Sequence, residues 1–345
     1  MSNLEATPAE LAFRGGQSSP AGVEPGSAGV KVLTGRDVPL GGPRAMRVRR
    51  TLPQRARSLI GAWCFADHYG PDDVTQGPGM NVPPHPHTGL QTVSWLFAGQ
   101  VEHRDSLGTH ALVRPGELNL MTSGHGICHS EVSTAETGVL HGVQLWVALP
   151  DSRRNGPRDF QHYVPPAVAL DGATARVFLG TLAGQRSPVP AGQRSPAAAG
   201  QQSPVATFTP LLGAEITLEP RARLALPTDP GFEHGVLVDA GPVSLSGTRL
   251  ERTELGYLPP GSATLQLVNL ADEPARILLL GGAPFEEDIV MWWNFVGRSH
   301  EEIATYRSAW EAELDQFGAV TGYAGTLQRL PAPALPNIRL KPRSR

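Results

Sequence analysis

Short apolar runs of at most eight residues recur along most of the chain. Glycine, proline, aspartate or asparagine bounds the runs, which is typical of β-strands separated by tight turns. The runs predict strands in eight segments: 91–97, 111–113, 142–147, 176–179, 215–218, 235–239, 263–268 and 275–280. They fall into two groups, one before about residue 165 and one after about residue 206. This pattern favours an all-β fold with two separate barrels or sandwiches.

One helical pattern stands near the end of the chain. Ser299 and Glu302 form the S-x-x-E sequence of a capping box. Apolar residues then follow at spacings of three and four, and Gly318 supplies a stop; they are Ile303, Tyr306, Trp310, Leu314 and Phe317. We therefore predict an amphipathic helix over 299–318 that packs against a sheet. Residues 319–345 are expected to form a tail whose basic side chains are solvated.

Two segments lack the apolar residues that a core needs. Residues 1–29 are rich in glycine, proline and serine and predict a flexible leader. The hexapeptide A-G-Q-R/Q-S-P recurs every eight residues within 183–204, a period too short for a solenoid unit. We interpret 183–204 as one surface loop lengthened by duplication, because long surface insertions cost little stability.

Composition and charge exclude several classes of protein. The 345 residues include 39 glycines and 33 prolines, and only 18% are charged, which disfavours a helical bundle, a coiled coil or a charged disordered chain. The net charge of −3 offers no broad basic surface, so no direct nucleic-acid partner is expected. No apolar run approaches the roughly 18 residues of a membrane helix, the first residues do not resemble a signal peptide, and two cysteines give no disulfide framework. We predict a cytoplasmic protein without a membrane partner, and a monomer fits two barrels packed on each other.

Histidines gather in the first half, where eight of the eleven lie between residues 68 and 141. His85 and His87 form an H-x-H pair, and His129 and Glu131 repeat that spacing with a carboxylate. Residues i and i+2 of a strand project to the same face, so both pairs could reach one ion. Three imidazoles and one carboxylate without a thiolate suit a first-row metal such as iron, manganese, nickel or copper. Spacing alone leaves open whether the pairs are metal ligands or incidental.

The remaining chemistry-bearing residues have weaker patterns. His125 is expected to line the pocket or to hydrogen-bond a ligand, and His103 to belong to a hydrogen-bonded hairpin beside a turn. Cys128 precedes a candidate ligand, so on a strand it would point to the opposite face as a buried, inert thiol. His141 is interpreted as a core or edge residue, and the histidines that we expect at the surface are His68, His110, His162 and His300.

Five segments together resemble the pirin family. They read PHPHTGLQTV at 84–93, VEHRDSLG at 101–108, PGE at 115–117, MTSGHGICHSE at 121–131 and LHGVQLWV at 140–147. The resemblance covers about residues 36–296 and implies a bicupin of the cupin superfamily. It implies an N-terminal cupin barrel over 30–165 with a metal site and a C-terminal cupin barrel over 166–298. The second barrel should be metal-free, because only His234 stands where the first has its H-x-H pair.

Carried over residue by residue, the resemblance implies metal ligands at His85, His87, His129 and Glu131, the same four that strand alternation selects. Pirins usually hold iron, so one Fe(II) per chain is expected, with manganese, nickel, copper or zinc as substitutes. The family's common motif has Arg and Glu where this chain has Thr88 and Gln91. Neither position is a ligand in the family, but the difference alters the expected charge of the pocket.

The resemblance leaves three functions open. Some pirins oxidise flavonols such as quercetin, which implies an Fe(II)-dependent dioxygenase acting on a flavonol-like enediol, with Glu131 as ligand and as base for the substrate hydroxyl. Others are described as iron-dependent regulators, which implies a non-enzymatic, redox-responsive protein that binds a protein partner. The third is a cupin that keeps a metal without a physiological reaction. An enzyme needs an apolar cavity near the ion, for which Trp95, Phe97 and Met121 are candidate wall residues, whereas a regulator needs an exposed patch.

Overall fold

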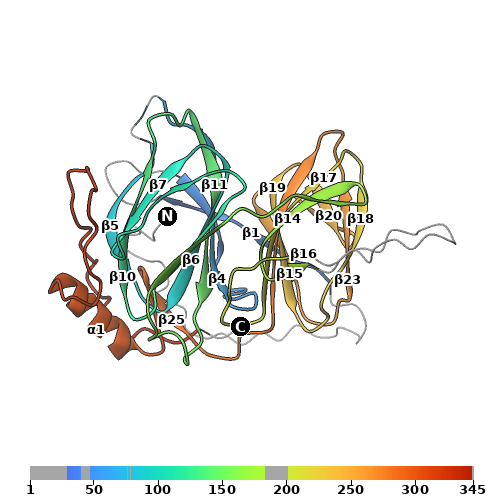
Figure 1. The fold of residues 1–345 in the computed structure, drawn as a ribbon. Helices are drawn as coiled ribbons and strands as arrows, with labels where there is room; N and C mark the ends of the chain where they lie inside the picture. The colour runs from blue at the N-terminus through green and yellow to red at the C-terminus, as the bar shows by residue number, and fades with distance from the viewer. Residues whose placement is uncertain (1–28, 40–46, 76, 78, 183–200, 344–345) are drawn as a thin grey trace.

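The computed structural model describes residues 29–39, 47–75, 77, 79–182 and 201–343. Within these ranges two β-barrels lie side by side, and one helix, α1 (His300–Glu311), lies on the outer side of the first barrel (Figure 1). The predicted all-β fold with two barrels and a late helix is confirmed. Residues 1–28 of the expected leader (1–29) and most of the repeat (183–204) lie outside the described residues.

The first barrel consists of a seven-stranded and a four-stranded antiparallel sheet. The larger sheet has the order β12 (Asp159–Tyr163), β9 (Leu118–Thr122), β6 (Leu90–Ala98), β11 (Val139–Ala148), β4 (Trp63–Asp73), β3 (Arg47–Leu52) and β2 (Arg36–Pro39). The smaller has the order β5 (Asn81–His87), β10 (Ile127–Ser133), β7 (Val101–Asp105) and β8 (His110–Val113).

The second barrel repeats this architecture. Its larger sheet has the order β1 (Lys31–Thr34), β22 (Glu254–Leu258), β19 (Glu233–Ala240), β24 (Ala275–Gly282), β17 (Leu211–Leu218), β14 (Ala173–Leu179) and β13 (Val168–Leu170). Its smaller sheet has the order β18 (Arg223–Pro227), β23 (Thr264–Asn269), β20 (Val243–Leu245) and β21 (Thr248–Leu250). Two short hairpins complete the set: β15 (Thr181–Leu182) with β16 (Gln201–Gln202), and β25 (Val290–Trp292) with β26 (Phe295–Gly297).

The expectation that the first barrel starts at residue 30 is wrong for its first strand. β1 pairs with β22, so residues 31–34 extend the larger sheet of the second barrel. The chain then crosses to the first barrel at β2, which pairs with β3. A strand at a sheet edge needs a partner for its backbone groups, and β22 offers one. The N-terminal segment therefore links the two barrels, because its first strand belongs to the second barrel and its next strand belongs to the first.

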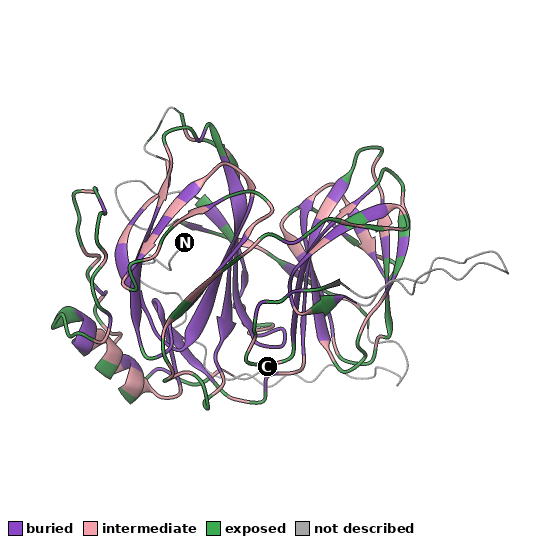
Figure 2. Ribbon diagram, in the orientation of Figure 1, coloured by how far each residue is buried: buried purple, intermediate pink, exposed green. Residues whose placement is uncertain are grey.

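Burial patterns separate strands with one buried face from strands buried on both. β18 alternates buried and exposed residues, as expected for a strand with one face in solvent. β6 and β11 are buried along almost their whole length (Figure 2). One face of these strands looks into the first barrel and the other packs on the second.

A large apolar core fills the junction between the barrels. It includes Trp63 and Trp95 of the first barrel and Phe178 and Leu278 of the second. Indole N–H groups of the first barrel donate to the second: Trp63 Nε1 lies 3.1 Å from the Leu212 carbonyl oxygen. Aromatic residues that bury both their ring and their N–H bond favour a fixed arrangement of the two barrels.

The helix is shorter than predicted. Its N-terminus agrees with the capping box, since Ser299 Oγ accepts the Glu302 N–H at 3.2 Å. It ends at Glu311, and Glu313 has a left-handed φ of 54°, which cannot continue a right-handed helix. Phe317 is still buried, but Leu314 is exposed. The apolar spacing predicted a helix that is too long, because Phe317 packs into the same apolar core from a turn beyond the helix end.

Of the tail's basic side chains, Arg339 and Lys341 are exposed, as predicted, but the described part of 319–345 packs on the rest of the protein. Leu330 N–H donates to the Pro84 carbonyl at 2.8 Å, and Tyr323 Oη lies 2.6 Å from Asn81 Oδ1. Leu340 is buried, and Arg343 forms two backbone hydrogen bonds with Ile289. The segment covers the outer face of β5, where Pro84 would otherwise leave its carbonyl group unpaired.

Among the described residues, no helix has the length and apolar character needed to cross a membrane.

Candidate metal centre

Strand pairing brings the two predicted ligand pairs together. β5 and β10 run antiparallel, with His85 directly opposite His129. The register shifts between His129 and Glu131, because Glu131 faces Val82 and two prolines of β5 lie opposite a single residue. Such bulges re-aim side chains and are frequent beside functional sites.

The three histidines form one compact cluster of ligand atoms. One nitrogen from each of His85, His87 and His129 lies within 4.8 Å of the other two. His87 Nε2 is 3.0 Å from His129 Nε2, and the ring centroids of His85 and His129 are 4.3 Å apart. All three side chains are at most 1% exposed. Nitrogen atoms that meet inside a barrel in this way can share one cation.

The protonation of these rings suits a metal. Burial lowers the pKa of His85 to about 4, and it lowers the pKa values of His87 and His129 well below the usual range, with the neighbouring imidazoles acting in the same direction. His85 Nδ1 donates to the Pro83 carbonyl oxygen at 2.7 Å, so its Nε2 carries a lone pair. That Nε2 is buried and has no hydrogen-bond partner among the described residues. A buried lone pair of this kind is what a metal ion would satisfy.

Glu131 joins the histidine cluster at one edge. One carboxylate oxygen of Glu131 lies within 4.8 Å of a ring nitrogen of His129 and of a ring nitrogen of His103. Glu131 does not form such a group with all three clustered histidines. Ser94 Oγ lies 3.2 Å from Glu131 Oε1 and 3.0 Å from Gln144 Oε1, and its single hydrogen serves one of the two acceptors. Burial and the charge of Glu131 raise the pKa of Tyr69 well above its usual value. The structure thus brings His85, His87 and His129 together and places Glu131 beside the last of them.

Behind His129 lies a chain of hydrogen bonds that runs through His103, the residue expected in a hydrogen-bonded hairpin. His103 Nδ1 is 3.3 Å from His129 Nδ1, and His103 Nε2 is 3.1 Å from Asp105 Oδ2. The other oxygen of Asp105 accepts two backbone N–H groups, from Leu107 at 2.9 Å and Thr109 at 3.0 Å. Burial disfavours the charge of Asp105, but these bonds, first that from His103, leave its pKa below the usual value.

The hydrogen bonds of His103 determine the tautomers of His103 and His129. An ionised Asp105 only accepts, so His103 Nε2 donates and His103 Nδ1 accepts from His129 Nδ1. His129 Nε2 is then left with a lone pair that faces His85 and His87. His103 and Asp105 lie at i and i+2 of β7. Their spacing, the same rule that selected His85 and His87, was the signal for this pair.

Most of the other histidines lie where a metal in the first barrel cannot reach them. His125 is exposed and donates through Nδ1 to the Gly156 carbonyl, so the expected pocket role is wrong. His110 is exposed, as predicted, beside Glu102. His68 was expected at the surface but is buried with His141 between the barrels. The sequence pattern could not predict this cluster, because its third member, Asp239, is distant from both histidines along the chain.

The expected pocket walls are partly wrong. Ser94 points to Glu131, so Trp95 and Phe97 lie on the opposite face of β6, toward the second barrel. Trp95 Nε1 donates to Glu215 Oε2 at 2.7 Å, across the junction. Met121 lies opposite Thr92, which shares the inward face with Ser94, and remains a wall candidate.

One of the two departures from the family motif lies off the inward face. Gln91 shares the face of Trp95, and its amide donates to Thr122 Oγ1 at 2.9 Å, so its side chain is directed away from Glu131. Thr88 is buried at the turn before β6, where its carbonyl accepts the Val296 N–H at 3.0 Å.

Cys128 lies on the face opposite His129, as predicted. It packs with Trp292 and Phe295 in the apolar cluster under α1. Burial raises the pKa of its thiol to about 12, so no thiolate is available for a metal.

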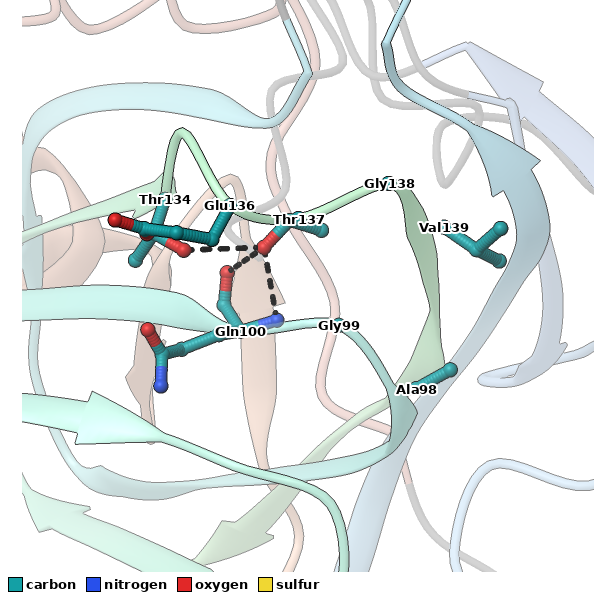
Figure 3. Close-up of a pocket in the computed structure, with 8 residues that line it drawn as sticks. All are labelled: Ala98, Gly99, Gln100, Thr134, Glu136, Thr137, Gly138 and Val139. Atoms are coloured by element: carbon teal, nitrogen blue, oxygen red, sulfur yellow. Dashed lines mark hydrogen bonds between the residues drawn. The ribbon is translucent and has the colours of Figure 1, made fainter.

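A surface cavity of about 370 Å³ lies away from these ligands. The connections after β6 and β10 line it, with Ala98–Gln100 from the first and Thr134 and 136–139 from the second. Thr137 Oγ1 accepts the Gln100 backbone N–H and donates to the Gln100 carbonyl, as Figure 3 shows. None of the four predicted ligands lines this cavity.

Comparisons with known proteins agree with the architecture. The family model described as Pirin matches residues 45–147, and the model described as Pirin C-terminal cupin domain matches residues 213–317. A Pseudomonas aeruginosa protein named "Putative quercetin 2,3-dioxygenase" is 42% identical over 305 residues, covering 88% of this chain and 90% of the relative. A Caulobacter vibrioides protein named "Pirin-like protein" is 34% identical over 274 residues, covering 77% and 88%.

A solved structure also agrees with the two-barrel architecture. The crystal structure of a quercetin 2,3-dioxygenase from Acinetobacter baumannii superimposes with a TM-score of 0.80 at 36% sequence identity. The match covers 90% of this chain and 97% of that chain. Both barrels are therefore included in the likeness.

Proposed function

This chain belongs to the pirin family, and from that premise we propose that it is an Fe(II)-dependent dioxygenase acting on a flavonol-like, quercetin-type enediol. In this proposal His85, His87, His129 and Glu131 hold one iron per chain, and Glu131 is also the catalytic base. Manganese, nickel, copper or zinc would be substitutes, because the donor set has no thiolate to select among them.

The observation that supports this most is the cluster of three neutral, buried imidazoles. Two of them have a nitrogen lone pair directed to the cluster by a hydrogen bond on the other ring nitrogen, from His85 to Pro83 and from His129 to His103. Metal-binding histidines in proteins are usually held in this way. Their burial also argues against an exposed patch that would present the ion to a protein partner.

The inward face beside the histidines suits a flat aromatic ligand. Trp146 contacts His87 with ring centroids 5.3 Å apart, and it stacks on Phe65 at 4.1 Å. Trp146 Nε1 is buried without a hydrogen-bond partner among the described residues, so it offers a donor to a ligand oxygen. A flavonol combines an aromatic ring system with adjacent carbonyl and hydroxyl oxygens, and these walls match both features.

Glu131 would take the proton from the flavonol 3-hydroxyl. Ser94 Oγ lies 3.2 Å from Oε1 of the carboxylate, and Glu131 lies beside His129, where it would be within reach of a substrate hydroxyl at the metal. A bound Fe(II) would supply coordination of the deprotonated oxygen and electron transfer toward O₂. The barrel excludes bulk water from this region, because His85, His87 and Glu131 are at most 2% exposed.

Oxygen uptake by the iron-loaded full chain tests the proposal. A panel of flavonols should give oxygen consumption with matching loss of flavonol. Flavones that lack the 3-hydroxyl are the matched control and should give none, since Glu131 would have no proton to take. If no flavonol is consumed by protein with verified iron, the dioxygenase proposal fails and the alternative, a redox-responsive regulator with a protein partner, is favoured.

A further inference from the structure

Two imidazoles and a carboxylate meet between the barrels, outside the candidate metal centre. His68 and His141 come from β4 and β11 of the first barrel, and Asp239 comes from β19 of the second. Asp239 Oδ1 lies 2.6 Å from Nε2 of each histidine, and the two Nε2 atoms are 3.3 Å apart. The side chains of His68, His141 and Asp239 are buried, with relative exposures of 1%, 9% and 2%. Three metal-binding atoms therefore converge at a place that the proposed function does not use.

The cluster is held by rigid elements on both sides. β11 pairs with β4 in the first barrel, and β19 pairs with β24 in the second, where the two larger sheets face each other (Figure 1). Arg276 Nε lies 2.6 Å from Asp239 Oδ2, which directs the other carboxylate oxygen toward the imidazoles. The ring of Phe97 packs on His141 with centroids 4.9 Å apart. Asp239 and His141 thus each have their orientation set by a neighbour, as in built metal sites.

We propose that His68, His141 and Asp239 form a second divalent-cation site that links the two barrels. Two imidazole nitrogens and one carboxylate oxygen are a donor set that zinc and other first-row divalent ions accept. The three protein ligands leave a position for water. The site adds one ion to the one expected in the first barrel.

The distances in the cluster lie close to those that such an ion needs. Zinc binds imidazole and carboxylate at about 2.0–2.2 Å, so tetrahedral ligand atoms lie about 3.3–3.5 Å apart. The two Nε2 atoms, at 3.3 Å, already meet this requirement. The two 2.6 Å contacts to Asp239 Oδ1 would lengthen by under about 1 Å when the ion replaces the shared hydrogens. Small side-chain rotations are sufficient for that change.

Nearby charges set a limit on the affinity. Asp239 is the anion of the site, while Arg276 bonds its second oxygen and Arg252 Nε donates to its backbone carbonyl at 2.9 Å. Both guanidinium groups repel a cation. We therefore expect this site to bind zinc more weakly than the three-histidine centre, and to fill second in a titration.

Zinc stoichiometry of the full chain tests the proposal. Equilibrium dialysis of the metal-free wild-type protein should give two zinc ions per chain. Asp239→Asn and His141→Ala should each reduce this to one, and His110→Ala, which removes an exposed histidine bonded to a carboxylate, should leave two. Circular dichroism and melting temperature verify that each variant is folded.

A cobalt titration separates this proposal from the proposed function. The His85→Ala/His129→Ala double variant should still bind one Co²⁺, with visible absorption that is lost when Asp239→Asn is added. A double variant that binds no Co²⁺, or whose absorption persists when Asp239→Asn is added, would overturn the site. Because the double variant lacks two ligands of the three-histidine centre, its count reports the junction cluster alone, and neither an empty first-barrel centre nor an inactive dioxygenase affects it.

Discussion

Each barrel pairs a seven-stranded sheet with a four-stranded one, so their inward faces can be compared strand by strand. In the second barrel the interior is a continuous apolar cluster that includes Val177, Ile216, Val236 and Ile277. In the first barrel the apolar cluster occupies only part of the interior. The rest holds the three histidines, Glu131 and other polar side chains.

The difference is clear at the histidines, although the expected correspondence of His234 to the H-x-H pair is wrong: His234 lies in the larger sheet of its barrel, and His85 and His87 lie in the smaller sheet of theirs. His234 lies on β19 with the inward-facing Val236 and Val238, but no second histidine accompanies it, and neither of its ring nitrogens has a hydrogen-bond partner among the described residues. In the first barrel, each of His85 and His129 has a bonded partner for one ring nitrogen. A small barrel filled with apolar side chains is a structural core. The same fold becomes a candidate reaction site when polar groups, together with the bonds that orient them, replace part of that core.

The largest expected effect contrasts the ligands of the first barrel with His234. His85→Ala should lower metal affinity at the three-histidine centre by on the order of 10²-fold or more, because a lost ligand weakens coordination directly. His234→Ala should leave the affinity unchanged. Elemental analysis after dialysis measures the metal, and equal retention in both variants would contradict the assignment of the metal to the first barrel.

The next effect concerns the chemistry of Glu131. Glu131→Gln keeps an oxygen that can coordinate but removes nearly all basicity, so flavonol oxidation should fall about 10²-fold or more while much of the iron remains. Glu136→Gln, at an exposed glutamate of the same barrel, is the matched control and should keep the wild-type rate. Iron must be measured on the same samples. Wild-type turnover in iron-loaded Glu131→Gln would exclude the proton-transfer role.

His103 should have a smaller effect than a ligand. His103→Leu removes the acceptor that holds the His129 tautomer, and the expected loss of metal affinity is roughly 10- to 100-fold. His110→Leu, on the adjacent strand β8, should have no effect. A loss in His103→Leu as complete as in His85→Ala would instead identify His103 as a ligand, which the grouping of His103, His129 and Glu131 would also permit.

The smallest effect uses the pH dependence of the second barrel. Burial lowers the pKa of His234 to about 4, below the usual 6.5, so the unfolded chain binds more protons than the folded one between these values. Stability from this group is therefore present above pH 6.5 and is lost as pH falls toward 4. Between pH 7 and pH 5 the loss should be about 2 kcal/mol.

His234→Leu removes that titration and should flatten the profile relative to the wild type. Urea unfolding of metal-loaded protein at several pH values measures it, since the bound metal keeps the first-barrel histidines from titrating. Parallel profiles for the two proteins would show that His234 does not carry the effect.

Several features follow from local rules that the sequence carries. Every segment predicted as a strand overlaps one, because alternation and turn residues are properties of neighbouring positions. The same rule places His85 with His87 on one face and Cys128 opposite His129. The helix start at Ser299 is local too, since one side chain caps a backbone group three residues away.

Tertiary structure decided the features that depend on which face of a strand looks inward. Alternation tells that Trp95 and Phe97 share a face, but β6 is buried on both faces, so no polar face marks the outside. The second barrel covers that face, which is why Trp95 bonds Glu215 instead of lining the pocket. The packing of 319–343 on β5 likewise depends on a surface made by distant strands.

The junction cluster shows the limit most clearly. His68, His141 and Asp239 are separated by up to 171 residues, and their meeting depends on how two barrels dock. Periodicity along one strand carries no information on which strands of another barrel will face it. The sequence by itself thus determined the strands and which side chains share a face, while only the packing of the two barrels decided what each face would meet.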